Sequence, residues 1–270
     1  IIAMWEVEKI ENCLMELLSC PLEDGTEILE RFRTLPNAIF RQGEKPLERF
    51  VYCPGSRKDR VLLIAHCDTV WDRAYGKTPQ PQSLVLDGDL VRSGCPTQGI
   101  GADDRAGCAM LWALRDSGHS LLVLDGEEHG HFGAKYLCSA HPKLLKELNA
   151  HAYMLQLDLW GGRRCMYHGI ANSRRFCRQI AAWGFQEERM PNGTDISYLC
   201  TTACGANLSV GYRGFHTPKE TLSVSRWEAV LHRLREELQK PQKRYRTRTA
   251  VRLYRRLRAF AAKQYHKHRR

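Results

Sequence analysis

The sequence predicts an α/β fold, a three-layer sandwich in which a mostly parallel central sheet lies between two layers of helices. Two observations lead to this prediction. Segments with strand character alternate with segments of helical periodicity along most of the 270 residues, which is the pattern of parallel sheets covered by helices. Residues 61–65 and 121–124 are continuously apolar, as expected for strands that are buried on both faces.

The region before residue 45 is predicted to be helical. Residues 4–18 place apolar side chains at helical spacing (Trp5, Ile10, Leu14 and Leu17). Residues 24–33 are expected to form a second, short helix that begins at Asp24. Strands are then predicted over residues 49–53 and 61–66, and Pro54-Gly55 marks the turn between them.

The middle of the chain is predicted to contain a hairpin and a loop that leads into a helix. Residues 84–92 are expected to form the hairpin, with Asp87-Gly88 as its turn. A glycine-rich loop follows over residues 94–101, and a helix is predicted from Asp104 to Asp116. The remaining strands are expected over residues 121–125, 153–159 and 206–210, and the remaining helices over residues 133–139, 174–183 and 223–239.

The net charge of +11 arises from one end of the chain. Residues 240–270 contain 13 of the 41 Lys and Arg residues and no acid, which leaves 28 basic and 30 acidic residues in the rest. Ala250, Tyr254, Leu257, Ala261 and Tyr265 recur at helical spacing among the arginines. We therefore expect a basic helical tail that packs on the body or binds an anionic partner.

Eleven cysteines at scattered spacings do not form the two close pairs of a Cys-type zinc site. They are interpreted mainly as small buried apolar residues of a protein in a reducing, cytoplasmic compartment. Residues 1–20 include Glu6, Glu8 and Glu11, so they lack the unbroken apolar run of a signal peptide. No run of about 18 apolar residues predicts a membrane span.

Polar side chains gather where the predicted strands end. His66 and Asp68 end one strand, Glu127 and Glu128 follow the next, and Asp158 ends a third. Asp103 and Asp104 lie between the glycine-rich loop and its helix, and His216 follows the strand over residues 206–210. Singly, each has an ordinary explanation, such as a helix N-cap for Asp103-Asp104. Together they are expected to meet in one crevice, because open α/β sheets bind ligands beyond the carboxyl ends of their strands.

The order of these segments resembles the superfamily of co-catalytic di-zinc exopeptidases. The segments are His-Cys-Asp (66–68), Gly-Ala-Asp-Asp-Arg-Ala-Gly (101–107), Asp-Gly-Glu-Glu (125–128), Gln-Leu-Asp (156–158) and Phe-His-Thr-Pro (215–218). That superfamily includes bacterial leucyl aminopeptidase, tripeptidases and glutamate carboxypeptidases. The resemblance covers about residues 45–239. It implies a zinc-exopeptidase-like fold, with one catalytic domain over residues 1–239 and the basic tail beyond it.

The resemblance also implies a role for each residue. His66 and Asp158 match the ligands of one zinc, Glu128 and His216 those of the second, and Asp103 the carboxylate that bridges both. The peptide bond after Asp103 is often cis in the family. Asp68 matches the carboxylate that orients His66. Glu127 matches the general base, which must stay free of the metals because a coordinated carboxylate is a poor base. Cobalt or manganese would also suit this ligand set.

Spacing indicates which branch of the superfamily the chain resembles. Asp158 and His216 are 58 residues apart, too few for the core elements plus an inserted lid domain of about 100 residues. His66 and Asp103 are 37 residues apart, too few for an inserted β-domain. The chain therefore resembles the compact single-domain branch.

Substrate contacts are the least determined part of the site. An aspartate at position 158 resembles the aminopeptidases, whereas carboxypeptidase-like members more often have glutamate. Thr194 and Asp195 belong to a segment that resembles a substrate loop of tripeptidases, or is simply a turn. Tyr167, Tyr198 and Tyr212 are each candidates to polarise the scissile carbonyl.

Three functions therefore stay open. The first is hydrolysis of an N-terminal peptide bond by a two-metal-activated water with Glu127 as general base. The second is hydrolysis of N-acyl amino acids or other small amides at the same site. The third is a non-catalytic binding module that acts through the basic tail. The third is disfavoured, because a binding module has no need of a general base.

Overall fold

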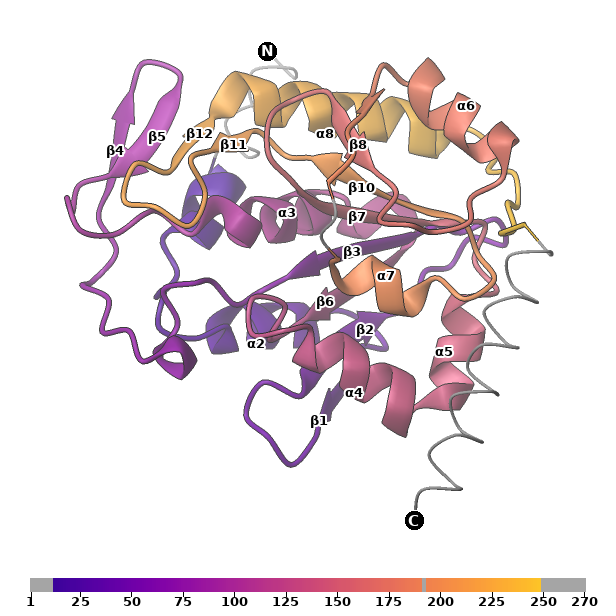
Figure 1. Cartoon of the computed structure of the whole chain (residues 1–270), viewed down its shortest axis with the longest axis horizontal. Helices are drawn as coiled ribbons and strands as arrows, with labels where there is room; N and C mark the ends of the chain where they lie inside the picture. Colours follow the sequence, from indigo (N-terminus) through magenta and orange to yellow (C-terminus); the bar gives the residue numbers. More distant parts are fainter. Residues whose placement is uncertain (1–11, 191–192, 249–270) are drawn as a thin grey trace.

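An eight-stranded sheet runs through the centre of the protein, in the order β1-β2-β6-β3-β7-β10-β8-β9 (Figure 1). The structure is a computed structural model that describes residues 12–190 and 193–248. The strands of this sheet are β1 (Ile39–Gln42), β2 (Arg49–Cys53), β3 (Leu62–His66), β6 (Ser120–Leu124), β7 (Met154–Leu159), β8 (Arg164–Met166), β9 (Gln186–Glu187) and β10 (Gly205–Ser209).

The four central strands, β6, β3, β7 and β10, are parallel to one another. Antiparallel strands flank them, with β2 and β1 at one edge and β8 next to β10 at the other. Four of the seven pairings are thus parallel, because β8 and β9 also run in the same direction. The α/β fold with a mostly parallel sheet that the sequence predicts is confirmed.

Helices cover both faces of the sheet and complete the three layers (Figure 1). On one face lie residues 12–18, which are helical, with α2, α3, α6 and α8, and on the other lie α4, α5 and α7. Their bounds are α2 (Thr26–Arg33), α3 (Ala102–Ala113), α4 (Phe132–Ala140), α5 (Pro142–Leu148), α6 (Arg174–Ala182), α7 (Asp195–Leu199) and α8 (Val224–Gln239).

Strand β3 shows why the parallel strands have continuously apolar sequences. Leu63 and Ala65 belong to the hydrophobic cluster on the α3 side of the sheet, whereas Leu62 and Ile64 belong to the cluster on the α4 side. Successive side chains of a strand point to opposite faces. Because both faces are covered, every position of β3 is buried and apolar until His66 ends the strand.

Helix α3 packs against β7 at unusually short range. A Cβ atom on Gly107 would lie 1.9 Å from the carbonyl oxygen of Leu157, so no larger residue fits there. The helix is shorter than the predicted 104–116, because it ends at Ala113 and a 3₁₀ turn follows over Arg115–Ser117. At its start, Asp103 and Asp104 have non-helical backbone angles.

A second, four-stranded antiparallel sheet lies beside the central one, in the order β11-β12-β5-β4. Its strands are β4 (Leu84–Asp87), β5 (Leu90–Ser93), β11 (Tyr212–Arg213) and β12 (Thr221–Ser223). The predicted hairpin is present, but its turn is Gly88-Asp89, one residue later than expected, since Asp87 pairs with Leu90. Gly88 has a positive φ of 59°, which glycine adopts without strain.

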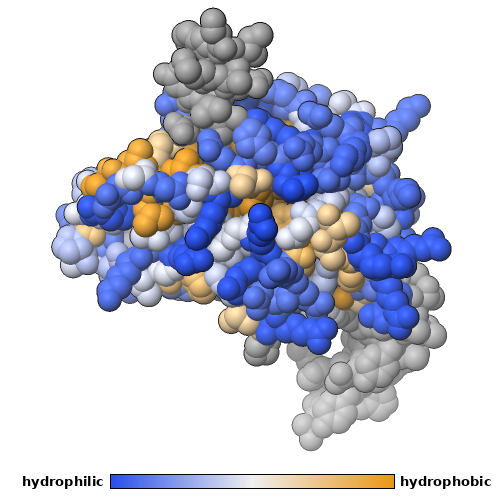
Figure 2. Space-filling view, turned by 90° about the horizontal axis from the view of Figure 1, so that it is seen from above, coloured by the Kyte–Doolittle hydropathy of each residue, from blue (hydrophilic) through white to orange (hydrophobic). Residues whose placement is uncertain are grey.

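Strands β11 and β12 had no counterpart in the sequence prediction, because two or three residues carry no periodicity. They join β10 to α8 and hold the loop of residues 214–220 beside the central sheet. The β4–β5 hairpin projects at the side of the molecule where apolar side chains gather in Figure 2, and Leu86 and Leu90 are exposed on it.

Three predictions about elements need correction. Residues 39–42, within the region expected to be helical, form strand β1, and helix α5 was not predicted.

Residues 240–248, the start of the expected helical tail, are not helical. They run along the body because Tyr245 packs on Phe176 and Arg246 donates hydrogen bonds to the carbonyls of Ala150, His151 and Ala152. The apolar stripe over residues 250–265 lies outside the described residues, as do Trp5 and Ile10.

All eleven cysteines are unpaired, and seven of them are buried. This agrees with their interpretation as small apolar core residues. Among the described residues, no helix combines the length and apolar character that crossing a membrane requires.

Candidate metal centre

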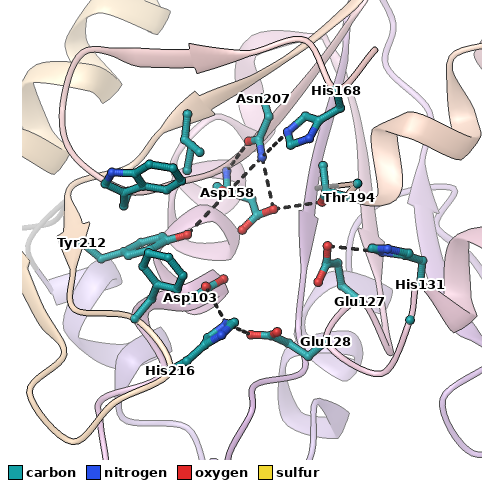
Figure 3. A pocket seen from close by; sticks show the side chains of 15 residues that line it. Asp103, Glu127, Glu128, His131, Asp158, His168, Thr194, Asn207, Tyr212 and His216 are labelled. Carbon is teal, nitrogen blue, oxygen red and sulfur yellow. Dashed lines mark hydrogen bonds and ion pairs between the residues drawn. The ribbon is translucent and has the colours of Figure 1, made fainter. Parts of the chain in front are cut away.

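The polar residues at the strand ends gather around one pocket of about 280 Å³ at the carboxyl edge of the parallel strands (Figure 3). Asp103, Glu127, Glu128, Asp158 and His216 line it, and His66 is buried next to Asp103 and Asp158. His66 ends β3, Asp158 is the fifth residue of β7, and Glu127 and Glu128 follow β6. Asp103 comes from the start of α3. His216 comes from the loop between β11 and β12, where its φ is 62°.

His66, Asp103 and Asp158 form one group of metal-binding type, with ligand atoms all within 4.8 Å of one another. His66 Nε2 lies 3.3 Å from Asp103 Oδ1 and 3.4 Å from Asp158 Oδ1. All three residues are buried.

Asp103, Glu128 and His216 form a second group of this type. His216 Nε2 lies 2.7 Å from Glu128 Oε1 and 3.2 Å from Asp103 Oδ2. Asp103 thus belongs to both groups, and each of its two carboxylate oxygens faces a different imidazole.

Asp68 ties the ends of two strands together. Its Oδ1 lies 3.3 Å from His66 Nδ1, the ring nitrogen that does not face the two groups. The backbone carbonyl of Asp68 lies 3.1 Å from the same nitrogen. Its carboxylate also accepts hydrogen bonds from the backbone N–H groups of Glu127, at 3.0 Å, and Glu128, at 3.1 Å. The sequence suggested the contact with His66 but not the contacts that hold the two glutamates.

Asp158 is held by three side-chain donors that converge on its Oδ2. Gln156 Nε2 donates at 2.9 Å, Thr194 Oγ1 at 3.1 Å and Asn207 Nδ2 at 3.4 Å. The other oxygen, Oδ1, remains directed at His66. Donors that occupy one oxygen and leave the other free are typical of the residues that orient a metal ligand.

The backbone around Asp103 is fixed by two buried acids. The Asp103–Asp104 peptide bond is cis, as the resemblance implied. Glu220 accepts hydrogen bonds from the backbone N–H groups of Ile100, Gly101 and Asp103. Asp104 accepts from the N–H groups of His66 and Gly107, so it caps the regular part of α3 and joins it to the end of β3.

The electrostatics of the site reflect many acids in little volume. Burial and the charge of Asp103 raise the pKa of Glu128 to about 8, and burial raises the pKa of Asp158 to about 7. Burial also raises the pKa of Glu220 to about 7. Although burial opposes it, the contacts with Asp103 and Glu128 raise the pKa of His216 to about 10. The crowded carboxylates therefore favour positive charge in their midst.

The two groups fit metal ions by their donor chemistry. Each offers one imidazole nitrogen, one carboxylate of its own and one oxygen of Asp103, which is the N/O donor set of zinc sites. The ring nitrogen of His66 that faces away from the group contacts Asp68, as is usual for metal-bound histidines. Two sites that share one carboxylate match the arrangement of two-metal hydrolases.

Glu127 belongs to neither group. Its carboxylate lines the pocket, and its Oε1 lies 3.3 Å from Nδ1 of His131 (Figure 3). The two adjacent glutamates therefore have different surroundings. Glu128 contacts a metal-group imidazole, whereas Glu127 faces the open pocket.

Two of the four predicted substrate contacts line the pocket and two do not. Thr194 and Tyr212 line it, and the Tyr212 hydroxyl donates to the backbone carbonyl of Asp158 at 3.4 Å. Tyr167 lines a neighbouring pocket instead, where its ring packs on Phe176 of α6. Asp195, the first residue of α7, is fully buried and does not line the pocket, and its Oδ1 lies 3.7 Å from His131 Nδ1.

The third candidate tyrosine, Tyr198, is 38% exposed on α7 and stacks on His131. Its hydroxyl has no place in the pocket lining. Of the three tyrosines considered from the sequence, Tyr212 is the one whose ring lies in the wall of the pocket.

One wall of the pocket is apolar, and it is formed by Leu159, Trp160, Tyr212 and Phe215. The rings of Trp160 and Phe215 stack with centroids 5.6 Å apart. The opposite wall is polar. This division suits a ligand with a hydrophobic side chain and a polar backbone.

Several residues of the site were given no role from the sequence, namely Gln156, Asn207, Glu220 and His131, and Asp104 was expected near the site without its contact to His66. Gln156 and Asn207 had a usable signal, since each is a polar residue inside an otherwise apolar strand. His131 was four residues from Glu127, and Glu220 followed His216 in the same short loop. For His131 and Glu220, the spacing in the sequence gave no indication of their contacts with Glu127 and Asp103.

The chain matches one family of known proteins. The model of the family described as Peptidase family M28 matches residues 50–233, which include every residue of the two metal groups. No curated protein matches the chain.

Solved structures share the fold. Aminopeptidase PepT from Bacillus cereus ATCC 10987 superposes with a TM-score of 0.63 at 14% identity, over 87% of this chain and 99% of that one. A tripeptidase from Staphylococcus aureus subsp. aureus Mu50 gives 0.62 at 14% identity, over 86% and 98%. The Pyrococcus horikoshii TET1 peptidase, which can assemble into a tetrahedron or a large octahedral shell, gives 0.58 at 15% identity, over 85% and 99%.

Proposed function

The chain belongs to peptidase family M28, within the co-catalytic zinc exopeptidase superfamily, and we propose that it hydrolyses the N-terminal bond of short peptides with two metal ions and Glu127 as general base. Membership of the family makes the protein a metallopeptidase. The number of ions, the role of Glu127 and the choice of the N-terminal bond are the proposed part.

One observation carries the proposal. The two oxygens of Asp103 face two different imidazoles, those of His66 and His216, while the neighbouring carboxylate of Glu127 contacts neither. A carboxylate that faces two imidazoles in this way can be shared by two metal ions. An adjacent carboxylate outside both groups can carry a proton.

His66, Asp103 and Asp158 would hold one ion, and Asp103, Glu128 and His216 the other. When bound, two divalent ions polarise the scissile carbonyl and lower the pKa of water towards about 7. Asp68 keeps His66 in the orientation that directs Nε2 at the ions, and Gln156, Thr194 and Asn207 do the same for Asp158.

Glu127 carries the proton. In the proposed reaction it takes one proton from the attacking water as the oxygen bonds to the carbonyl carbon. It returns that proton to the nitrogen of the leaving amine as the C–N bond breaks. Its carboxylate lines the pocket on the same side as the metal groups, which is where both transfers take place. General acid–base catalysis of this kind contributes about 10²–10⁴-fold to a rate.

Four observations support an exopeptidase that holds the amino end. Position 158 is aspartate, as in the aminopeptidases that the sequence resembles. A pocket of about 280 Å³ has room for one side chain and part of a backbone rather than a long polypeptide. Residues 159–215 are taken up by β8, α6, β9, α7, β10 and β11, so no lid domain is inserted between the ligands. Two proteins of this fold are named an aminopeptidase and a tripeptidase.

The test uses the full chain loaded with zinc and a panel of tripeptides with free or acetylated amino ends. The proposal expects cleavage of the free peptides at the first bond, and at least about 10²-fold lower kcat for Glu127→Gln with its metal content unchanged. Glu236→Gln, an exposed change on α8, is the matched control and keeps wild-type kcat. Full activity of Glu127→Gln would overturn the mechanism. Cleavage of acetylated substrates alone would favour an amidohydrolase of N-acyl amino acids.

A further inference from the structure

A buried carboxylate beneath the pocket lacks the partners that such a group requires. Asp195 has no exposed surface, and within the described residues neither of its oxygens accepts a hydrogen bond. Burial, the nearby carboxylate of Glu127 and those of Asp68 and Asp158 raise its pKa well above the usual value. Unpartnered buried carboxylates are rare, because leaving water without a compensating contact is costly.

Capping of helix α7 does not account for Asp195. The N-terminus of this helix is served by other side chains. Thr194 and Ser197 form a reciprocal capping box, and Gln156 Oε1 accepts from the backbone N–H of Ile196 at 2.9 Å. The carboxylate of Asp195 is therefore available for a different contact.

A side-chain nitrogen of His131 lies close to this carboxylate. Its Nδ1 lies 3.7 Å from Asp195 Oδ1 and 3.3 Å from Glu127 Oε1, and within the described residues it makes no hydrogen bond with either. One imidazole nitrogen thus stands between a fully buried carboxylate and the general base. The ring belongs to neither metal group.

The ring of His131 is held in place from three sides. Its backbone N–H donates to the carbonyl of Glu127 at 3.0 Å, which closes a tight turn over residues 127–131. Its φ of 64° lies in the left-handed region, which is uncommon for residues other than glycine. The ring also packs on Tyr198, with centroids 5.1 Å apart. The backbone of His131 is thus tied to that of Glu127, and its ring is held by Tyr198.

We propose that His131, backed by Asp195, is a positioning residue for the general base. Asp195 keeps the ring in the tautomer that has its proton on Nδ1, and this N–H directs the Glu127 carboxylate towards the pocket. Both carboxylates face the same ring nitrogen, so a single N–H serves Asp195 and Glu127 together. The inference rests on the proposed role of Glu127.

A residue that only orients the base affects the transition state more than substrate binding. His131→Leu, which removes the donor, is expected to lower kcat about 10–100-fold while KM changes less than about threefold. His131→Gln keeps an N–H donor and is expected to recover part of the loss. Asp195→Asn should lower kcat in the same direction. The double variant His131→Leu with Asp195→Asn should be no slower than His131→Leu alone, because the two residues act as a unit.

The experiment measures kcat, KM and metal content of these zinc-loaded, full-length variants on one free-amine tripeptide. Lys143→Gln, an exposed change on α5, is the control and is expected to keep wild-type values. An activity-independent readout is the ¹H–¹⁵N spectrum of the imidazoles. The wild type should show a His131 Nδ1–H signal, and both Asp195→Asn and Glu127→Gln should shift it.

Wild-type kcat in His131→Leu would overturn the inference. So would additive losses in the double variant, or a His131 proton on Nε2 alone. A loss of metal that matches the loss of kcat would also overturn it, since the effect would then be structural. If Glu127→Gln is inactive and His131→Leu is normal, the inference alone fails. If Glu127→Gln is fully active, the proposed function fails, and the imidazole spectrum still decides whether His131 lies between the two carboxylates.

Discussion

Glu220 Oε1 accepts a hydrogen bond of 3.1 Å from the backbone N–H of Asp103, the residue shared by both metal groups. The other oxygen of Glu220 accepts hydrogen bonds from the backbone N–H groups of Ile100 and Gly101. One buried carboxylate therefore fixes the backbone that leads into α3. Glu220 follows His216 by four residues in the same loop. The loop that supplies one imidazole therefore also fixes the aspartate that belongs to both groups.

Glu220→Gln is expected to disturb this support. The amide nitrogen that replaces one oxygen would face backbone N–H donors, so at least one hydrogen bond to a charged group is lost. We expect a loss of about 2–4 kcal/mol in the free energy of unfolding, measured by urea denaturation in the presence of a chelator. Glu236→Gln, on the surface of α8, should stay within about 0.5 kcal/mol of the wild type. An unchanged stability in Glu220→Gln would contradict the role assigned to Glu220.

Gln156→Leu should weaken one metal site and spare the other. Gln156 donates to Asp158 in the group with His66, whereas the group with His216 has no contact with it. Loss of such an orienting partner typically lowers metal affinity about 10–100-fold. Competition with a chelator of known affinity should show one ion released early and the second retained. If each ion binds the variant as tightly as it binds the wild type, Gln156 does not orient a metal ligand and the assignment is wrong.

The strand ends and the ligand positions were accessible from the sequence for a physical reason. Parallel strands buried on both faces have continuous apolar sequences, so the point where polarity returns, as at His66, indicates both the end of the strand and the edge where ligands bind. The hairpin turn was displaced by only one residue, since glycine fits either of its central positions.

The parts that escaped prediction depend on contacts between distant segments. Whether Tyr167 or Tyr212 enters the pocket depends on where β8, which pairs with β10, and β11, which pairs with β12, lie in the fold, and no local pattern indicates this. Gln156 and Asn207 meet at Asp158 because their strands are neighbours. Asp195 was expected to face substrate, yet it lies under the pocket against His131.

Removal of metal should destabilise the protein, because ligands bound only by the folded state stabilise it. For free zinc at about 100 times its dissociation constant, the expected loss on chelation is about 2.7 kcal/mol per site. This corresponds to a fall in Tm of about 5–10 °C per site for a chain of this size. Differential scanning fluorimetry with and without chelator measures it, and zinc in excess should restore Tm. A Tm that does not respond would show that the two groups hold no metal.

His151 should make the protein less stable in mild acid. It is buried at the end of the sheet opposite the pocket, where its Nε2 contacts Ser120 Oγ at 2.8 Å. Burial and the charge of Arg60 lower its pKa to about 4. The unfolded chain, with a histidine pKa of about 6.5, binds the proton first as pH falls, so stability present above pH 6.5 is lost between about pH 6.5 and 4.

The size of this effect can be isolated by comparison with His151→Gln. Between pH 7 and 5 the free energy of unfolding of the wild type should fall by about 2 kcal/mol more than that of the variant. Urea denaturation at the two pH values, with chelator present, gives both numbers. A fall of the same size in both proteins would mean that His151 is not held neutral.

The most direct test of the two-metal site is a crystal of the zinc-loaded protein measured at the zinc absorption edge. The anomalous difference map should contain two peaks on either side of Asp103. One peak should lie among His66, Asp103 and Asp158, and the other among Asp103, Glu128 and His216, with Glu127 bound to neither. A single peak, or a peak on Glu127, would contradict the account.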